Sequence, residues 1–369
     1  MAAVEFEVLT AASGQIGRAT LNVEATLNSL TLEMVDLLQA QLDEWAQDDN
    51  IAAVFIDAAG EKAFCAGGDV QALYASATKT PGGPCEYAEE FFTREYQLNY
   101  SLHAYAKPLI CWGHGIVMGG GLGVMAGCSH RIVTERTRIA MPEVTIALFP
   151  DVGGSWFLNH APGSSGEFLA LTGASINAAD AIYIGLADRF IASEHKDAVL
   201  KQLSAQNWGA STEANHALVR HVLRPFAQQS IGAWPAGQVE PHIATINALC
   251  DGDSIHDIID SICAQDTDDP WLQKARDSLA QGSKLAALWI DRQLWETRHS
   301  SLKEVFQAEI QLATNIIRHP EFAEGVRALL IDKDRNPSWQ FAASRDVPQE
   351  TLEHFFSAPW ESNPLSDLH

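Results

Sequence analysis

The chain has 369 residues, 47% hydrophobic and 19% charged, and its 24 Lys and Arg are outnumbered by 47 Asp and Glu, giving a formal charge of -23. This composition argues against collagen-like, coiled-coil and wholly disordered chains. The acidic balance argues against nucleic acid and anionic membranes as partners, since their phosphates would be repelled. We expect a globular protein.

Six cysteines are spread along the chain without a Cys-x-x-Cys pair. Disulfide scaffolds are normally short and dense in cysteine, so we expect free thiols in a reducing compartment. Glu5 and Glu7 lie where a secretory signal would need basic and then uninterrupted apolar residues. The expected location is therefore the cytoplasm.

The segment 108–128 resembles a membrane span, because it carries no charged residue over about the length that a bilayer requires. It also contains seven glycines and His114. Glycine weakens a helix by up to about 1 kcal/mol relative to alanine. We therefore predict a buried strand, a glycine turn and a short helix, and no membrane association.

The first elements are predicted as a hairpin and a helix. Residues 4–10 and 16–21 are typical of strands joined by a turn. Apolar residues from Leu30 to Trp45 recur at the spacing of one buried helix face, and Asn28 or Ser29 can cap that helix.

The pattern then alternates between strands and helices. Residues 52–56 form an apolar run typical of a strand, Asp69 can cap a helix that begins at Val70, and 86–106 favours a long helix. Further strands are predicted at 109–112, 131–134 and 138–140. This alternation predicts the α/β class.

After residue 205 the strand signals fade, so we place a boundary there, with a core at 1–205 and a helical region at 206–369. We expect the last residues, 363–369, to be frayed. Helices are predicted at 212–223, 255–264, 282–297, 302–318 and 321–331.

Two glycine clusters, at 65–68 and 118–123, each follow a predicted strand and precede a predicted helix. Such turns expose backbone N–H groups beside the positive end of a helix, so two of them facing one point would bind an oxyanion. Close packing of helix on strand is the alternative for each cluster. Residues 121–126 also match the dinucleotide fingerprint GxGxxG/A, which leaves a nicotinamide-dependent oxidoreductase as a different class of function.

Two carboxylates, Glu143 and Asp151, lie eight residues apart, each beside a proline. Paired carboxylates are typical of proton transfer. The alternatives are a helix N-cap for Asp151 and a first-turn helix acid for Glu143.

The histidines and cysteines indicate no metal site, because no HExxH or clustered HxH motif occurs. His114 and His130 lie among apolar residues and are interpreted as hydrogen-bonded structural histidines. Cys65 could act as a nucleophile, but a small buried residue is the favoured interpretation.

Three motifs together resemble the crotonase superfamily: KAFCAGGD at 62–69, GIVMGGG at 115–121 and MPEVTIALFPDVGG at 141–154. Within it, the resemblance is to the hydrolases of 3-hydroxyisobutyryl-CoA, an activity of valine catabolism. Other matching segments lie at 94–99, 169–173 and 324–334.

The resemblance implies a spiral core of ββα turns followed by helices, which binds an acyl-CoA thioester. It implies an oxyanion hole made by the Gly68 and Gly120 amides. No separate cofactor is implied, because coenzyme A is part of the substrate. Members of the superfamily often form homo-oligomers, so the resemblance implies a homo-oligomer as an alternative to a single chain.

The resemblance assigns Glu143 and Asp151 as catalytic carboxylates and Glu95 as a further polar contact to the substrate. Lys62 and Ala66 are expected to contact the substrate as well, Lys62 as a partner for the CoA phosphates. Substrate-binding roles are thereby expected for Glu95, Gly120, Lys62 and Ala66.

The resemblance also narrows the reaction. Hydratases of the superfamily carry a second glutamate where this chain has Gly123, and they commonly have a glycine where it has Asp151. Both differences favour thioester hydrolysis. The alternatives are an enoyl-CoA hydratase or isomerase and a non-catalytic acyl-CoA-binding protein.

Overall fold

The computed structural model describes residues 2–209 and 211–368. Its contacts group the chain into two compact units, each assembled from three segments. The first unit comprises 1–68, 98–139 and 176–237, and the second unit comprises 69–97, 140–175 and 238–369.

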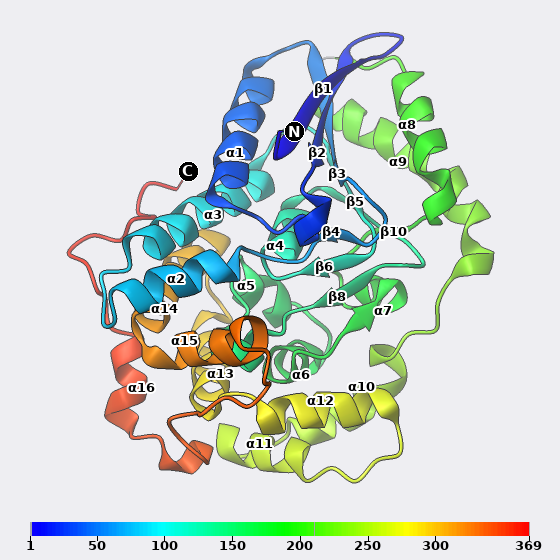
Figure 1. Ribbon diagram of the computed structural model, residues 1–369. Coiled ribbons are helices and arrows are strands. Elements are labelled where there is room, and N and C mark those ends of the chain that lie inside the picture. Colours follow the sequence, from blue (N-terminus) through cyan, green and yellow to red (C-terminus); the bar gives the residue numbers. More distant parts are fainter. Residues whose placement is uncertain (1, 210, 369) are drawn as a thin grey trace. The chain divides into compact units, whose positions relative to one another are not determined.

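The main sheet of the first unit has six strands in the order β1-β2-β3-β5-β7-β10 (Figure 1). Strand β1 pairs antiparallel with β2, as the predicted hairpin requires, and the remaining pairs are parallel. β3 is buried along its whole length, which fits its continuous apolar run. The strands are Val4–Thr10, Gln15–Leu21, Ile51–Ala58, Leu109–Gly113, His130–Val133 and Arg189–Phe190.

A second sheet has four short strands in the order β4-β6-β8-β9. They are Ala63–Cys65, Ile116–Met118, Arg138–Ala140 and Ile176–Asn177. The segment 108–128 therefore contains the predicted buried strand, β5, and the predicted short helix, α4 (Gly120–Gly127), together with a second strand, β6, that was not predicted. Among the described residues, no helix has the length and hydropathy needed to cross a membrane.

Helix α1 (Leu32–Gln47) confirms the predicted helix, but its cap differs from the prediction. The side chain of Thr31 caps the helix by accepting a hydrogen bond from the Met34 N–H. Asn28 instead has a left-handed backbone, and its side-chain amide donates to the carbonyls of Ala59 and Ala63. Asn28 thus stabilises the loop before β4.

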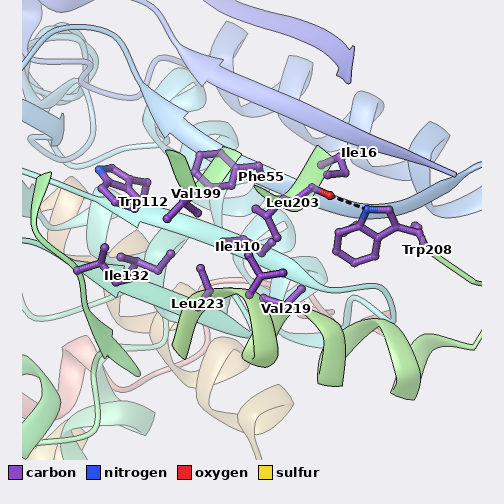
Figure 2. Packing of buried hydrophobic residues seen from close by; sticks show 14 residues of the cluster. Ile16, Phe55, Ile110, Trp112, Ile132, Val199, Leu203, Trp208, Val219 and Leu223 are labelled. Atoms are coloured by element: carbon purple, nitrogen blue, oxygen red, sulfur yellow. Dashed lines mark hydrogen bonds between the residues drawn. The ribbon is translucent and has the colours of Figure 1, made fainter. Parts of the chain in front are cut away.

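Helices α8 (Lys196–Ser204) and α9 (Thr212–Gln229) pack on the main sheet and close a hydrophobic core (Figure 2). The Trp208 indole N–H donates to the carbonyl of Leu203 at 3.1 Å, which fixes the connection between the two helices. The core includes Phe55, Ile110, Trp112, Val199, Val219 and Leu223.

The second unit is mainly helical, in agreement with the predicted helical C-terminal part. Its helices after residue 237 are α10 Val239–Leu249, α11 Ile255–Cys263, α12 Pro270–Gln281, α13 Lys284–Thr297, α14 Leu302–Arg318, α15 Pro320–Val326 and α16 Gln349–Phe355. Its earlier segments contribute α2 (Val70–Lys79), the start of α3 (Glu86–Ala104), α5 (Gly154–Asn159) and α6 (Ser165–Thr172). The sequence did not predict α6, α10, α12 and α16, although Asp269 and Pro270 are a cap and first residue typical of helix α12.

The division of the chain into two units does not coincide with the predicted boundary at residue 205, because α8 and α9 both complete the core of the first unit. The boundary described a change of secondary structure, and as a statement about domains it stays a prediction.

The chain's end corrects the expectation of fraying over the described residues up to 368. Leu365 and Leu368 are buried, and the side chains of Gln307 and Lys303 donate to their carbonyls at 3.1 and 2.6 Å. His369 lies outside the described residues. These contacts fix the last turns of chain to α14.

The core of the first unit makes Leu223→Ala a test of how α9 is held. Leu223 is fully buried, so truncation should lower the free energy of unfolding by roughly 2–5 kcal/mol. Urea unfolding followed by circular dichroism measures this loss. The control Gln228→Ala on the exposed side of α9 should change stability by less than about 0.5 kcal/mol. Equal losses in both variants would contradict this packing.

Candidate active site

The first glycine turn follows β4 in the first unit. Gly67 has a φ of +113°, a conformation that side chains rarely adopt. Its carbonyl accepts from the Leu30 N–H at 2.8 Å, and the Ala66 N–H donates to the Leu27 carbonyl at 3.1 Å. No hydrogen bond among the described residues uses the Gly68 N–H. The turn therefore leaves one amide available for a ligand.

The second glycine turn, between β6 and α4, lies against the first. A Cβ on Gly67 would lie 3.5 Å from the Met118 carbonyl oxygen and 4.0 Å from the Gly120 nitrogen. Gly120 is the first residue of α4, where helix N–H groups have no partner within the helix. The first unit thus brings together the two turns that the oxyanion-hole hypothesis requires.

Gly121 serves the close packing that we considered as the alternative. A Cβ there would lie only 2.4 Å from the Cys65 carbonyl oxygen, so α4 can approach β4 only because this residue is glycine. Cys65 is fully buried, which agrees with a structural role. The dinucleotide interpretation is wrong, because residues 121–126 lie inside a buried helix and not in the turn before it.

The second unit brings together the three carboxylates named from the sequence. Glu95 lies on α3, Glu143 begins the short 3-10 helix η2 (Glu143–Ile146), and Asp151 precedes α5. Their exposed fractions are 2%, 5% and 4%. Each interacts electrostatically with at least one other member of this group. Paired carboxylates that share a buried site can hold different protonation states.

Burial and mutual repulsion set the acidities of these groups. Burial raises the pKa of Glu143 well above its usual range, and the charge of Asp151 raises it further. Burial also raises the pKa of Glu95, to which the charges of Asp151 and Glu143 add. Burial raises the pKa of Asp151 to about 6. The three carboxyl groups therefore all resist ionisation, and the charge of Asp151 acts on both glutamates.

Tyr96 explains why Asp151 differs from its neighbours. Its phenol donates to Asp151 Oδ2 at 2.7 Å, and this hydrogen bond lowers the pKa of Asp151 against the effect of burial. Sequence reasoning did not single out Tyr96, although it follows Glu95 within the matching segment 94–99. The N-cap of α5 is Gly153, so the capping interpretation of Asp151 is wrong.

Two carboxylate oxygens of the cluster have no hydrogen-bond partner among the described residues: Glu95 Oε1 and Glu143 Oε2. Buried polar atoms are almost always hydrogen-bonded, so an exception calls for a bound water or ligand. Glu143 also occupies the first turn of η2, as the structural alternative proposed. Its burial distinguishes it from a first-turn acid at an exposed helix end.

Helix η2 is fixed tightly, and with it the backbone of Glu143. The Ser283 N–H donates to the Val144 carbonyl at 3.1 Å, and the Leu148 N–H donates to the Glu143 carbonyl at 2.9 Å. A Cβ on Gly325 would lie 2.6 Å from the Ile146 carbonyl carbon, so α15 packs directly on this backbone. The position of Glu143 is thus determined by residues far along the chain.

A fourth buried carboxylate, Glu309 of α14, belongs to the same cluster. Its two oxygens accept from the Gly153 and Ser155 N–H groups at 2.7 and 2.9 Å. Burial raises the pKa of Glu309 to about 8, although these two bonds lower it. The sequence missed this residue. In the sequence, Glu309 is indicated by its place on the apolar face of an amphipathic helix, beside Ile310.

The remaining candidates are placed as follows. Lys62 is exposed just before β4, and its contact with substrate stays a prediction. His114 is hydrogen-bonded to the Gly60 carbonyl at 2.9 Å, and His130 to His216 at 2.9 Å, in agreement with structural roles. Within residues 2–209 and 211–368, no three His, Cys, Asp or Glu side chains are grouped to hold a metal ion.

Comparison with known proteins places these motifs in a family. The family model described as enoyl-CoA hydratase/isomerase matches residues 16–356. The proteins named 3-hydroxyisobutyryl-CoA hydrolase, mitochondrial, are similar to this chain. The one from Danio rerio is 35% identical over 95% of this chain and 90% of its own, and the one from Homo sapiens is 35% identical over 95% and 89%.

Solved structures of similar proteins agree with this family and with the fold described above. A carnitinyl-CoA dehydratase from Mycobacterium thermoresistibile superposes with a TM-score of 0.86 at 33% identity, covering 99% of this chain and 98% of its own. An enoyl-CoA hydratase from Rhodobacter sphaeroides 2.4.1 gives 0.82 at 31%, covering 97% and 98%. The predicted resemblance and the crotonase-like α/β fold are thereby confirmed, and the chain belongs to the enoyl-CoA hydratase/isomerase family.

Proposed function

We propose that this protein hydrolyses a 3-hydroxyacyl-CoA thioester, with 3-hydroxyisobutyryl-CoA as the expected substrate and 3-hydroxyisobutyrate and CoA as products. The observation that carries the proposal is Glu143, a buried carboxylate with an oxygen that lacks a partner among the described residues. The names of the similar hydrolases support the same reaction. Our proposal places this reaction in valine catabolism.

In this proposal, the thioester carbonyl oxygen accepts from the Gly68 and Gly120 amides. These donors bind the negative charge that develops as the carbonyl carbon becomes tetrahedral, and such a donor changes a rate by roughly a hundred- to a thousand-fold. The neighbouring turns and the unused Gly68 N–H support this role.

Glu143 initiates the cleavage. It acts either as the base that removes a proton from water or as the nucleophile that forms a mixed anhydride with the acyl group. Single turnover in H2(18)O identifies the anhydride route if 18O enters the Glu143 carboxyl group, because water can label this group only by attacking the anhydride at the Glu143 carbonyl carbon.

Asp151 and Glu95 assist Glu143 in the proposed reaction. Asp151, which is held by the Tyr96 phenol, orients Glu143 or the substrate hydroxyl, or helps protonate the departing thiolate, and Glu95 holds the 3-hydroxyl group through its unpartnered Oε1. Lys62 and Ala66 contact the CoA portion, and coenzyme A enters only as part of the substrate. Gly123 is buried within α4 and offers no carboxylate, which favours hydrolysis over hydration of a double bond.

The cysteines support the proposed reducing compartment. Among the described residues, no disulfide joins any of the six cysteines: Cys65, Cys85, Cys111, Cys128, Cys250 and Cys263. We propose a cytoplasmic location, whereas the names of the similar hydrolases place those proteins in mitochondria. Cell fractionation decides between the two.

Glu143→Gln tests the proposed initiating group. Thiol release from 3-hydroxyisobutyryl-CoA should fall by roughly a hundred- to ten-thousand-fold, because the amide can neither take up the proton nor attack. The melting temperature should not fall. Burial raises the pKa of Glu143, so its ionised form destabilises the fold as pH rises, and glutamine removes that cost.

The matched control for this test is Glu240→Gln, the same change at an exposed position of α10, which should leave thiol release unchanged. Near-normal turnover by Glu143→Gln would exclude the assignment. Loss of crotonyl-CoA absorbance without thiol release would identify a hydratase. Thermal stabilisation by CoA without any turnover would identify a binding protein.

Asp151→Asn tests the electrostatic coupling between the two carboxylates. The charge of Asp151 raises the pKa of Glu143, so its removal should shift the acid limb of kcat/KM to lower pH. Maximal turnover should decrease at the same time. A pH profile of thiol release between about pH 4 and 9 measures both effects, and an acid limb that stays in place would contradict the coupling.

A further inference from the structure

We propose that Glu309 is a positioning residue for the hydrolysis: it holds the turn that carries Asp151 by binding the backbone amides of Gly153 and Ser155. This inference rests on the proposed function and adds to it a residue that acts on the substrate only through Asp151.

The turn needs such a restraint because its backbone is strained. Val152 follows Asp151 directly and has a φ of +55°, which is unusual for a β-branched residue, and Gly153 has a φ of +84°. Strained conformations of this kind persist where surrounding contacts determine them, and they are common at functional sites. Val152 is fully buried, so its side chain is held in the protein interior.

Glu309 supplies the restraint from a distant part of the chain. The bond from the Gly153 N–H spans 156 positions of sequence and is 2.7 Å long, and the bond from the Ser155 N–H is 2.9 Å long. Each oxygen of the carboxylate accepts a hydrogen bond from one of these two N–H groups, which belong to the residues on either side of Gly154. Two hydrogen bonds to one carboxyl group fix both the position and the orientation of a backbone segment.

The same helix also restrains the other side of Asp151. Phe306 lies three residues before Glu309 on α14, and its ring lies 5.9 Å from the ring of Tyr96. Tyr96 in turn donates to Asp151 Oδ2 at 2.7 Å. Residues three apart share one helix face, so α14 holds the Asp151 backbone through Glu309 and its carboxylate through Phe306 and Tyr96.

A purely structural cap for α5 would use the same two bonds, so the experiment must separate the two roles. Glu309→Gln keeps the size of the side chain but replaces one acceptor oxygen by an NH2 group, which cannot accept from an amide. We expect kcat for thiol release to fall about tenfold with KM little changed. The same substitution in the Asp151→Asn background should cost little or nothing more, because its effect passes through Asp151.

The matched control is Thr314→Val on the same helix. Thr314 is also buried, and its hydroxyl donates only to the Ile310 carbonyl of its own helix at 2.8 Å. This variant should leave kcat unchanged in both backgrounds. If Glu309→Gln does not fold, Glu309→Asp takes its place, since its shorter side chain cannot reach both amides.

Amide hydrogen exchange provides a readout that is independent of turnover. Segment 150–156 should exchange faster in Glu309→Gln than in the unmodified protein, with other segments unchanged. Unchanged exchange there, or a kcat loss of the same size in the Asp151→Asn background, would overturn the positioning role. If the unmodified protein releases no thiol from any hydroxyacyl-CoA, the proposed function fails, whereas hydrogen exchange still decides whether Glu309 holds the turn.

Discussion

Carboxyl groups that share a buried space repel one another once they lose their protons, and the second unit places four of them together. Glu95, Glu143, Asp151 and Glu309 are all buried, and burial raises the pKa of each. A protein accepts such an arrangement at a cost in stability, because a charged group in an apolar surrounding loses its hydration. The arrangement is intelligible if the groups act on a ligand.

The scaffold divides the four groups by their hydrogen bonds. Glu309 uses both oxygens on backbone amides, and Asp151 receives the Tyr96 phenol, whereas Glu95 and Glu143 each keep one oxygen without a partner among the described residues. In the proposed reaction, Glu309 and Asp151 support the site, whereas Glu95 and Glu143 contact the substrate. The first unit supplies a different feature, the two adjacent glycine turns.

The sequence predicted most of the first unit and the central site residues, because these depend on local patterns. The strands of the main sheet follow apolar runs, and the Asp69 cap of α2 follows from a single side chain. Family resemblance supplied Glu95, Glu143 and Asp151. Tyr96 and Glu309 were missed because their importance arises from contacts between distant segments, and Asn28 was misassigned as a cap for the same reason.

The shift to the Thr31 cap and the unpredicted C-terminal helices have simple causes. Asn28 and Thr31 both suit an N-cap, and only the long-range bonds of Asn28 to Ala59 and Ala63 decide between them. Helices α10 and α16 have no side-chain cap, unlike α14, whose Ser301–Glu304 capping box marks its start. The start of α12 is marked by Asp269 and Pro270, a signal that the prediction overlooked. Local chemistry predicts where elements begin, whereas tertiary contacts decide which side chains act.

The protonation state of Glu143 tests the central claim most directly, and infrared difference spectroscopy during a pH titration measures it. The account requires a protonated carboxyl band that persists well above the usual pKa range of glutamate and that is absent in the variant with glutamine at this position. The loss of this band with rising pH should coincide with the acid limb of kcat/KM, because only the ionised Glu143 can take up a proton or attack. An ionisation of Glu143 and an acid limb that lie at different pH values would contradict the account.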